Sequence, residues 1–249
     1  MGTAESGTAA QLLPMVQDSL RAFVPVLSPG DRARLERPEF SNGLTSFLLL
    51  LTATNKVMNL TADADPRHLL TTHVRDSLAP LLAGLEPPST LLDIGSGGGF
   101  PAVPLALAWP ETQVTLSESI GKKARFLQRL AEEIPLPRAQ VVHGRVEDPG
   151  THLSSGRFDM ITARGVARTP TVFHYAAPLL AEGGRLVLWK GEHDLAELDD
   201  PPFVAILRRL HCTVMVADYA LPDIERNSKL VILQMTPTIG GMMHGRNGL

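Results

Sequence analysis

Apolar residues in the first third of the chain recur at three- and four-residue spacing. The stretches "QLLPMVQDSLRAFV" (11–24) and "FSNGLTSFLLLLTATNKV" (40–57) both show this spacing, and the turn signal "LSPGD" lies between them. Such spacing places the apolar side chains on one face of an α-helix. No strong strand pattern interrupts this part, so we expect residues 11–85 to form a helical N-terminal extension.

The pattern changes at Leu91, where short apolar runs begin to alternate with helical stretches. Five runs bounded by glycine, proline or polar residues are strand candidates: "TLLDIG", "QVTLSES", "AQVVHG", "FDMITAR" and "GRLVLWKG". Between the second and third, "GKKARFLQRLAEEI" places Ala124, Leu127 and Leu130 on one helical face. Strands that alternate with helices predict an α/β fold, with a mostly parallel sheet covered by helices on both faces.

The last two apolar runs predict how the sheet ends. The runs "CTVMVADYAL" and "KLVILQM" leave no room for a helix between them, so they should pair antiparallel near one edge of the sheet. We expect this sheet domain to span residues 86–236. Residues 1–10 are small and polar, and residues 237–249 are glycine-rich without periodicity, so a disordered N-terminus and a flexible tail are expected.

The composition is that of an ordinary globular protein, with 44% hydrophobic and 20% charged residues. The single cysteine, Cys212, cannot form a disulfide framework and lacks partners for a zinc cluster, so no metal site is expected. No apolar run reaches the roughly 18 to 20 residues of a membrane span, and the stretch "MGTAESGTAAQ" lacks the basic start and apolar core of a secretory signal. We therefore expect a cytoplasmic protein and take it to be a monomer. The net charge of −3 means that a nucleic-acid partner would need a local basic patch.

The segment "LLDIGSGGGFP" (91–101) contains four glycines within five positions. A strand that ends in a glycine-rich turn before a helix lets backbone N–H groups approach a ligand closely. A dinucleotide-binding turn has glycines at its first, third and sixth positions. Gly95 and Gly97 match the first two, but Phe100 occupies the sixth. This difference argues against a pyrophosphate ligand.

Two acids near this turn favour a cationic nucleoside. Asp93 directly precedes the turn, where a carboxylate would repel phosphate but tolerate a positive ligand. Glu118 ends the next strand candidate, where an acid can accept hydrogen bonds from both ribose hydroxyls. A positively charged adenosine without phosphates describes S-adenosylmethionine. The residues that this reasoning assigns to the cofactor are Asp93, Gly95, Gly97, Gly99 and Glu118.

Several motifs resemble those of the RsmG family, also called GidB, and they follow the family's order from about residue 45 to 191. The motifs are "NKVMNLTA", "HVRDSLAP", "LLDIGSGGGFPAVPLALAWP", "KKARFLQRL", "VVHGRVED", "FDMITARGVA" and "GGRLVLWKG". This family places a methyl group on N7 of a guanine in small-subunit (16S) ribosomal RNA. The resemblance therefore implies a Rossmann-like class I methyltransferase fold, S-adenosylmethionine as cofactor, and small-subunit RNA or the 30S particle as partner.

The resemblance also assigns roles to individual residues. It implies that Gly95 and Phe100 line the methionine and adenosine portions of the cofactor. Val146 and Glu147 would flank the adenine, and Arg164 would face the cofactor site.

Four positions depart from the family pattern. Glu118 stands where the family usually has an aspartate and should still bind the ribose. The sequence has Thr54 in place of a common tryptophan, and Ala163 to Gly165 read "ARG" where "SRA" is usual. The arginine of that triplet is retained.

The expected chemistry needs no catalytic acid or base. N7 of guanine carries a free lone pair and no proton at neutral pH, so alignment for an in-line displacement supplies most of what the protein can offer. RNA would need cations, and the helix after Glu118 carries a basic cluster that could equally be a solvated face. The candidate RNA contacts are Lys122, Lys123, Arg125, Arg145, Lys190 and, with a lower expectation, His73.

Two alternatives stay open from the residues alone. A methyltransferase for a small molecule or a protein would suit the weak overall acidity of the chain. A Rossmann-type protein that binds a nucleotide without methyl transfer, or an NAD-dependent dehydrogenase, would also have a glycine turn. Phe100 and Asp93 disfavour the second alternative, and binding of NAD without binding of S-adenosylmethionine would support it.

Overall fold

The computed structural model describes residues 3–63, 65–134, 136, 138–151, 153, 156–221 and 224–236. Seven strands form one sheet in the order β3-β2-β1-β4-β5-β7-β6. The strands are β1 (Thr90–Ile94), β2 (Gln113–Glu118), β3 (Ala139–His143), β4 (Phe158–Arg164), β5 (Leu180–Lys190), β6 (Cys212–Leu221) and β7 (Ile224–Met235). Each of the seven overlaps a predicted run, although β5 begins at Leu180 and β7 at Ile224, several residues before the runs "GRLVLWKG" and "KLVILQM".

The sheet is parallel from β3 to β5, and β7 runs antiparallel to both β5 and β6. This confirms the predicted antiparallel strand near one edge. Parallel neighbours need long crossover connections, whereas β6 and β7 are joined directly. The β6–β7 hairpin therefore forms the edge farthest from β3.

The helices before the sheet are α1 (Thr3–Phe23), η1 (Val24–Val26), α2 (Pro29–Leu35), α3 (Pro38–Met58), α4 (Pro66–His68), η2 (Leu69–Val74), α5 (Arg75–Ser77) and α6 (Ala79–Leu82). Those within and after it are α7 (Ala102–Ala108), α8 (Gly121–Glu133), η3 (Pro149–Thr151), α9 (Thr169–Ala176), η5 (Ala177–Leu179), η6 (Glu192–Asp199) and α10 (Pro201–Arg209). The helical segments predicted before the sheet and after Glu118 are thus present.

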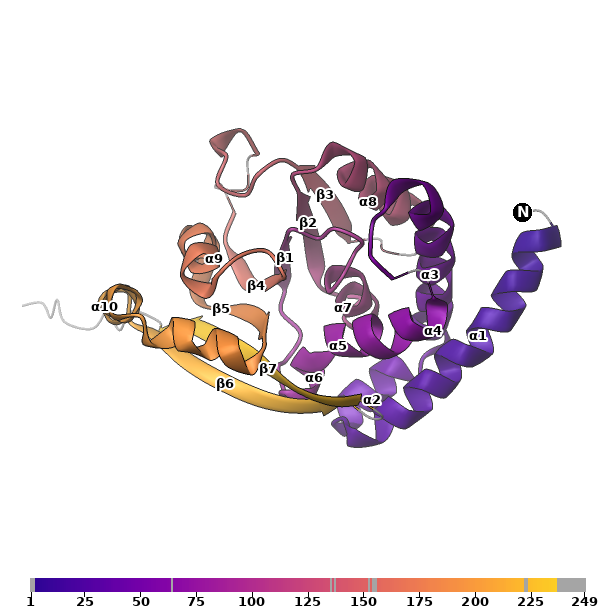
Figure 1. Cartoon of the computed structure of the whole chain (residues 1–249), viewed down its shortest axis with the longest axis horizontal. Coiled ribbons are helices and arrows are strands. Elements are labelled where there is room, and N and C mark those ends of the chain that lie inside the picture. The colour runs from indigo at the N-terminus through magenta and orange to yellow at the C-terminus, as the bar shows by residue number, and fades with distance from the viewer. Residues whose placement is uncertain are drawn as a thin grey trace, which may run out of the picture.

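The start of the chain differs from the expectation of disorder. Helix α1 begins at Thr3, so residues 3–10 are helical rather than irregular. Three alanines lie in this segment, and alanine has the highest helix propensity of all residues. The first turns of α1 extend away from the rest of the molecule (Figure 1). The flexible tail predicted for residues 237–249 lies outside the described residues.

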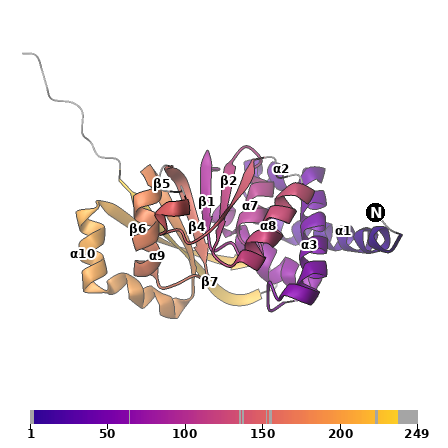
Figure 2. The ribbon, with the colours of Figure 1, turned by 90° about the horizontal axis from the view of Figure 1, so that it is seen from above.

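Helices cover both faces of the sheet. Figure 2 shows α9 and α10 on one side and α3, α7 and α8 on the other. Successive side chains of a strand point to opposite faces. In β1, Leu91 belongs to a first hydrophobic cluster, which includes residues of α1 and α3, and Leu92 belongs to a second, which includes residues of α9 and α10. The apolar runs of the parallel strands are therefore buried on both sides.

The N-terminal helices share one hydrophobic core with the sheet. Buried Val16 of α1 and Phe47 of α3 belong to the same cluster as Met160 of β4 and Ile232 of β7. The hairpin formed by β6 and β7 reaches beneath α6 toward these helices (Figure 1), and Tyr219 joins the same cluster. The helical extension therefore packs as a layer of the sheet domain.

Candidate active site

The glycine turn connects β1 to α7 at the carboxyl edge of the sheet. Gly95, Gly97 and Gly99 have φ angles of +71°, +54° and +96°, in the left-handed region that favours glycine. The N–H groups of Gly95 and Ser96 both donate to the Ser117 carbonyl, at 2.9 and 3.0 Å. The turn is thereby fastened to the end of β2.

Neighbouring side chains leave no room for larger residues in the turn. A Cβ added to Gly99 would lie 2.9 Å from Val103 Cγ2 and 3.1 Å from Phe47 Cε2. A Cβ added to Gly95 would lie 2.9 Å from Cγ2 of Val166, which belongs to the loop between β4 and α9. This loop therefore closes over the turn from the other side.

Glu118, at the end of β2, holds the turn from below. Its Oε2 accepts a hydrogen bond from the Gly97 N–H at 2.9 Å, and its Oε1 accepts one from the Ile120 N–H at 2.8 Å. The residue is only 4% exposed. A carboxylate oxygen has two lone-pair sites, so each oxygen retains acceptor capacity for a ribose hydroxyl.

Asp93 lies in β1 beneath the turn and is fully buried. Its Oδ1 accepts a hydrogen bond from Thr162 Oγ1 at 2.7 Å, while its Oδ2 has no partner among the described residues. Burial raises the pKa of this carboxyl to about 6. An orphaned buried carboxylate oxygen is costly to the fold, and it suits a site that receives a cationic group.

Phe100 follows the glycines and packs against residues from three other parts of the chain. Its ring centroid lies 5.0 Å from that of Phe47 and 5.3 Å from that of His73. The Arg164 guanidinium carbon lies 5.4 Å from the same ring. The sixth-position phenylalanine thus joins the turn to the end of β4 and to the N-terminal helices.

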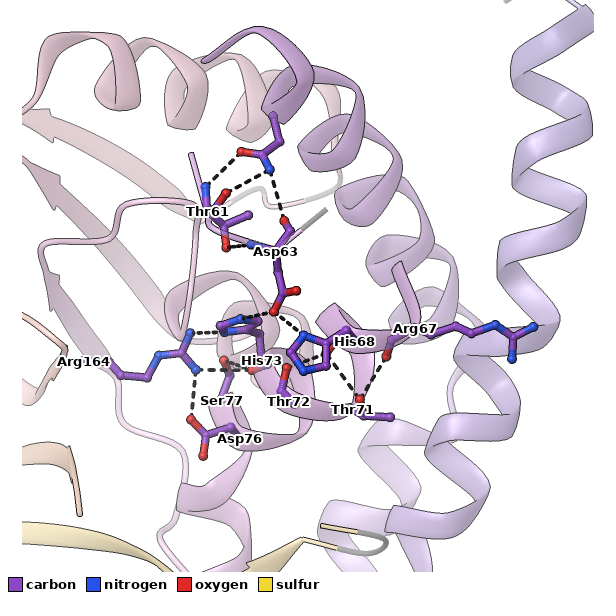
Figure 3. A network of polar contacts seen from close by, with 11 residues as sticks. Thr61, Asp63, Arg67, His68, Thr71, Thr72, His73, Asp76, Ser77 and Arg164 are labelled. Atoms are coloured by element: carbon purple, nitrogen blue, oxygen red, sulfur yellow. Dashed lines mark hydrogen bonds and ion pairs between the residues drawn. The ribbon is translucent and has the colours of Figure 1, made fainter. Parts of the chain in front are cut away.

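Arg164, at the end of β4, takes part in a polar network (Figure 3). Its Nη1 donates to Asp76 Oδ2 at 3.0 Å, and its Nη2 lies 3.1 Å from Nδ1 of His73. Asp76 also accepts a hydrogen bond from the Tyr219 hydroxyl, and its carbonyl accepts one from Trp189 Nε1 at 2.7 Å. The network therefore joins β4, β5 and β6 to α5.

The other side of His73 faces the loop after α3. His73 Nε2 lies 3.2 Å from Asp63 Oδ2, which His68 Nδ1 also contacts. The Asn55 side chain fixes this loop: its Oδ1 accepts the N–H groups of Leu60 and Thr61, and its Nδ2 donates to the carbonyls of Thr61 and Asp63. The loop is thus held at both of its ends.

The sequence reasoning missed the partners in this network, which are Asn55, Asp63, Asp76 and Tyr219. The first three lie within or next to the motifs "NKVMNLTA" and "HVRDSLAP", so the motifs themselves were the available signal. Pairing of these two motifs with Arg164 depends on three-dimensional proximity, which spacing along the chain does not reveal.

The residues expected near the adenine follow β3. Val146 is half-buried and packs against the second hydrophobic cluster. Glu147 and Arg145 are exposed, and Arg145 Nη1 lies 3.6 Å from Glu147 Oε1. An exposed pair at this distance holds neither side chain firmly, so both remain available to a ligand.

The predicted basic residues fall into two groups. Lys122 and Arg125 are exposed on α8, and Lys123 is half-buried there. Lys190 is different: its side chain is 9% exposed, and its Nζ donates to Glu197 Oε2 at 3.1 Å and to the Ala167 carbonyl at 3.4 Å. The structure therefore does not place Lys190 with the exposed cations.

The sheet order and the glycine turn at its carboxyl edge define the class of the protein as Rossmann-like α/β proteins. Two solved structures share the fold: an O-methyltransferase from Bacillus cereus in complex with SAH (TM-score 0.55, 17% identity, 77% of this chain and 91% of that chain) and cofactor-bound Rv0187 from MTB (TM-score 0.54, 21% identity, 78% and 90%). At these identities the likeness concerns the fold alone.

The sequence narrows the class to one family. The pattern of rRNA small subunit methyltransferase G (GidB) matches residues 41–218. Curated relatives named ribosomal RNA small subunit methyltransferase G include one from Roseiflexus castenholzii, 38% identical over 76% of this chain and 80% of its own length. Another, from Chloroflexus aggregans, is 37% identical over 74% and 77%. The chain belongs to the rRNA small subunit methyltransferase G family, as the resemblance of its motifs predicted.

Among the described residues, no helix combines the length and the apolar character needed to cross a lipid bilayer.

Proposed function

We propose that the protein transfers a methyl group from S-adenosylmethionine to N7 of one guanine in 16S ribosomal RNA. The observation that carries this proposal is the family match over residues 41–218, which includes motifs outside the cofactor turn. In the structure, two of these motifs contribute Asp63, His73 and Asp76 to the network around Arg164. A generic cofactor-binding protein would have no need of them.

The residues at the turn fit the proposed cofactor. The orphaned Oδ2 of Asp93 favours a ligand with a positive centre, and Glu118 retains acceptor capacity for a ribose. Backbone groups of the glycine turn would lie against the methionine and ribose portions. The full set proposed to surround the cofactor is Asp93, Gly95, Gly97, Gly99, Phe100, Glu118, Val146, Glu147 and Arg164.

The protein's own contribution is alignment and exclusion of water. When bound, the cofactor supplies an electrophilic methyl group on a sulfonium, which the unprotonated N7 can attack in line. Because no proton has to be removed, we assign no general base to His73 or Asp93. A fixed turn and a buried Phe100 would instead hold the reactants in a productive orientation, which accounts for large rate effects in intramolecular reactions.

The RNA would lie along the carboxyl edge of the sheet. Lys122, Lys123 and Arg125 on α8 and Arg145 after β3 are proposed to contact phosphates, which would compensate locally for the net charge of −3. A guanine within a hairpin would also have to leave its stack to reach the methyl group. We propose that the protein acts in the cytoplasm as a monomer.

Methyl transfer to small ribosomal subunits tests the proposed function. Subunits lacking the modification are incubated with cofactor labelled in its methyl group, and the labelled nucleotide is mapped. We expect label at N7 of a single 16S guanine. Absence of label there, with a folded protein that binds the cofactor, would refute the proposed substrate.

Glu118 provides the sharpest test of the cofactor site. Glu118→Ala should weaken binding of S-adenosylmethionine by about tenfold or more, since a hydrogen bond to a charged group contributes roughly 1.5–3 kcal/mol. Glu118→Gln is the milder comparison, because its amide oxygen can still accept the Gly97 N–H, while its NH2 group cannot accept the Ile120 N–H; its affinity should lie between those of the parent and the Ala variant. Calorimetry measures both affinities, and equal, unchanged affinity would remove Glu118 from the site.

A further inference from the structure

His73 lies where three parts of the molecule meet. It belongs to η2, a π-helical turn, and such turns often occur at functional sites. Its Nδ1 faces Arg164 at the end of β4 and its Nε2 faces Asp63 in the loop after α3 (Figure 3). Its ring also packs beside Phe100. Nothing in the proposed chemistry requires a histidine at this position.

The partners of His73 determine where its proton resides. A guanidinium can only donate hydrogen bonds, so the Arg164 N–H must donate to Nδ1 and Nδ1 must be unprotonated. The remaining ring proton is then on Nε2, which donates to the Asp63 carboxylate at 3.2 Å. His68 and Asp76 are the other titratable groups facing this cluster. The arrangement selects a neutral imidazole with its proton on Nε2.

A charged imidazole would not fit this arrangement. Protonation of Nδ1 would place two cationic donors 3.1 Å apart. Burial of His73 and the charge of Arg164 both lower the pKa of the imidazole, against the opposing influence of Asp63 and Asp76. Geometry and electrostatics therefore agree on the same protonation state.

We propose that neutral His73 is a positioning residue that fixes the Arg164 guanidinium over the Phe100 ring and thereby ties the loop of residues 60–63 to the cofactor turn. The inference rests on the proposed function, in which Arg164 faces the cofactor. It replaces the expectation that His73 itself contacts RNA.

Contacts on either side of His73 support this link. The loop of residues 60–63 lies next to the cofactor turn, because a Cβ added to Gly98 would lie 3.7 Å from the Leu60 carbonyl oxygen. Asn55 fixes the same loop through four hydrogen bonds. His73 thus connects a loop of defined shape to Arg164.

Arg164 is held through both of its terminal nitrogens. Nη1 donates to Asp76 Oδ2 at 3.0 Å and to the His73 carbonyl at 3.5 Å, and neither contact needs the imidazole. Without the imidazole, Nη2 would lose its acceptor at 3.1 Å, so the plane of the guanidinium would be less well fixed. We therefore expect loss of His73 to change the placement of Arg164 and to leave the fold intact.

Two substitutions distinguish the contact of Nδ1 with Arg164 from the contact of Nε2 with Asp63. The side-chain oxygen of His73→Asn can take the place of Nδ1, and the longer amide of His73→Gln reaches the place of Nε2. His73→Gln should reduce kcat on small subunits by about tenfold to a hundredfold, the cost expected for misplacement by about 1 Å. His73→Asn should restore kcat to within about threefold, because it still offers an acceptor to Arg164.

The matched control is His174→Gln, which makes the same substitution at an exposed histidine on α9 and should leave kcat unchanged. The inference predicts that the thermal midpoint differs little between the Asn and Gln variants at His73, whereas calorimetric affinity for S-adenosylmethionine is lower in the Gln variant, because Arg164 faces the cofactor. Equal kcat for the two variants, whether both high or both low, would overturn it, as would a more active Gln variant. If the parent itself does not methylate guanine N7, the proposed function fails instead.

Nitrogen NMR of the parent protein tests the inference without any activity measurement. With ¹⁵N-labelled histidine, and the His73 signals assigned by their loss in His73→Asn, we expect chemical shifts of the neutral Nε2–H form at pH 7. In Arg164→Met the imidazole should protonate at a higher pH than in the parent, because a repelling cation is gone. A cationic or Nδ1–H imidazole in the parent at pH 7 would overturn the inference.

Discussion

Arg164 and Lys190 end neighbouring parallel strands, yet their surroundings differ. The pairing of β4 with β5 places Arg164 opposite Trp189, one residue before Lys190. Because side chains alternate along a strand, Arg164 and Trp189 point toward the N-terminal helices, where Trp189 is part of the first hydrophobic cluster. Lys190 points to the opposite face and meets Glu197 of η6.

The comparison shows that a cation at a strand end has no fixed role. Arg164 contacts Phe100 and His73, so it lies between the cofactor turn and the N-terminal motifs. Lys190 and Glu197 hold the loop between β4 and α9, through the Ala167 carbonyl and the Thr169 N–H. One arginine therefore belongs to the candidate site, and the lysine next to it is a structural support.

The largest effect is expected from Asp76→Ala, on the Arg164 face. It leaves a partly buried guanidinium without its counter-ion and removes the acceptor of the Tyr219 hydroxyl. We expect a loss of about 2–4 kcal/mol in the free energy of unfolding, because an unpaired buried charge is costly. Urea unfolding measures it, with Asp76→Asn as the milder control. A loss below about 1 kcal/mol would show that water replaces Asp76 as the partner of Arg164.

Asp93 tests the same face through a group that feels the charge of Arg164. Its pKa is raised in the folded state from 3.8 to about 6, so its stabilising contribution is complete below pH about 4 and is lost as the pH rises through 6. Asp93→Asn should therefore be more stable than the parent above pH 7, by about 1–3 kcal/mol. The advantage should disappear near pH 4. Chemical unfolding between pH 4 and pH 7 measures the difference in stability. Calorimetry should show that the variant binds the cofactor more weakly than the parent does.

Glu197→Gln tests the Lys190 face. Burial alone would raise the pKa of Glu197, but hydrogen bonds from Thr169 and Lys190 outweigh it and lower the pKa to about 2. The resulting stability is present above the unfolded pKa of about 4.5 and is lost as the pH falls through 2. After allowance for solvent screening, the Gln variant should be about 1–2 kcal/mol less stable at pH 7. Thermal unfolding at pH 7 and pH 2.5 should show the difference shrinking in acid.

The smallest effect is expected from Arg168→Ala. Its Nε lies 3.2 Å from Glu197 Oε1, but its side chain is 71% exposed. Exposed ion pairs contribute little, so the free energy of unfolding should change by less than about 0.5 kcal/mol. Urea unfolding of Arg168→Ala and of Glu197→Gln measures both losses, and their comparison shows how much of the Glu197 effect comes from Arg168 and how much from Lys190. A larger loss in Arg168→Ala than in Glu197→Gln would identify the exposed arginine, rather than Lys190, as the important partner.

The sequence predicted the sheet well because both of its signals are local. Short apolar runs bounded by turns marked every strand, and the missing helix before "KLVILQM" marked the antiparallel one. The predicted strand boundaries also placed Gly95 and Phe100 in the turn after β1 and Glu118 at the end of β2.

The parts that were not predicted depend on distant contacts. Which face Lys190 points to is set by the register of β5 against β4, and a shift of one residue would exchange its surroundings with those of Trp189. The same limit applies to Asp76, whose partner Tyr219 is 143 positions away along the chain. The helical state of residues 3–10 was missed for a different reason, since these small and polar residues carry no apolar pattern that would indicate it.

That separation has a consequence for biosynthesis. The helices of the N-terminal layer leave the ribosome first, but the β6–β7 hairpin that completes their hydrophobic cluster is made last. At about 5–20 residues per second, the 143 positions between Asp76 and Tyr219 correspond to a delay of about 7–30 s. During that interval Asp76 lacks its partner Tyr219, so this part of the hydrophobic cluster is completed only after β6 and β7 have been made.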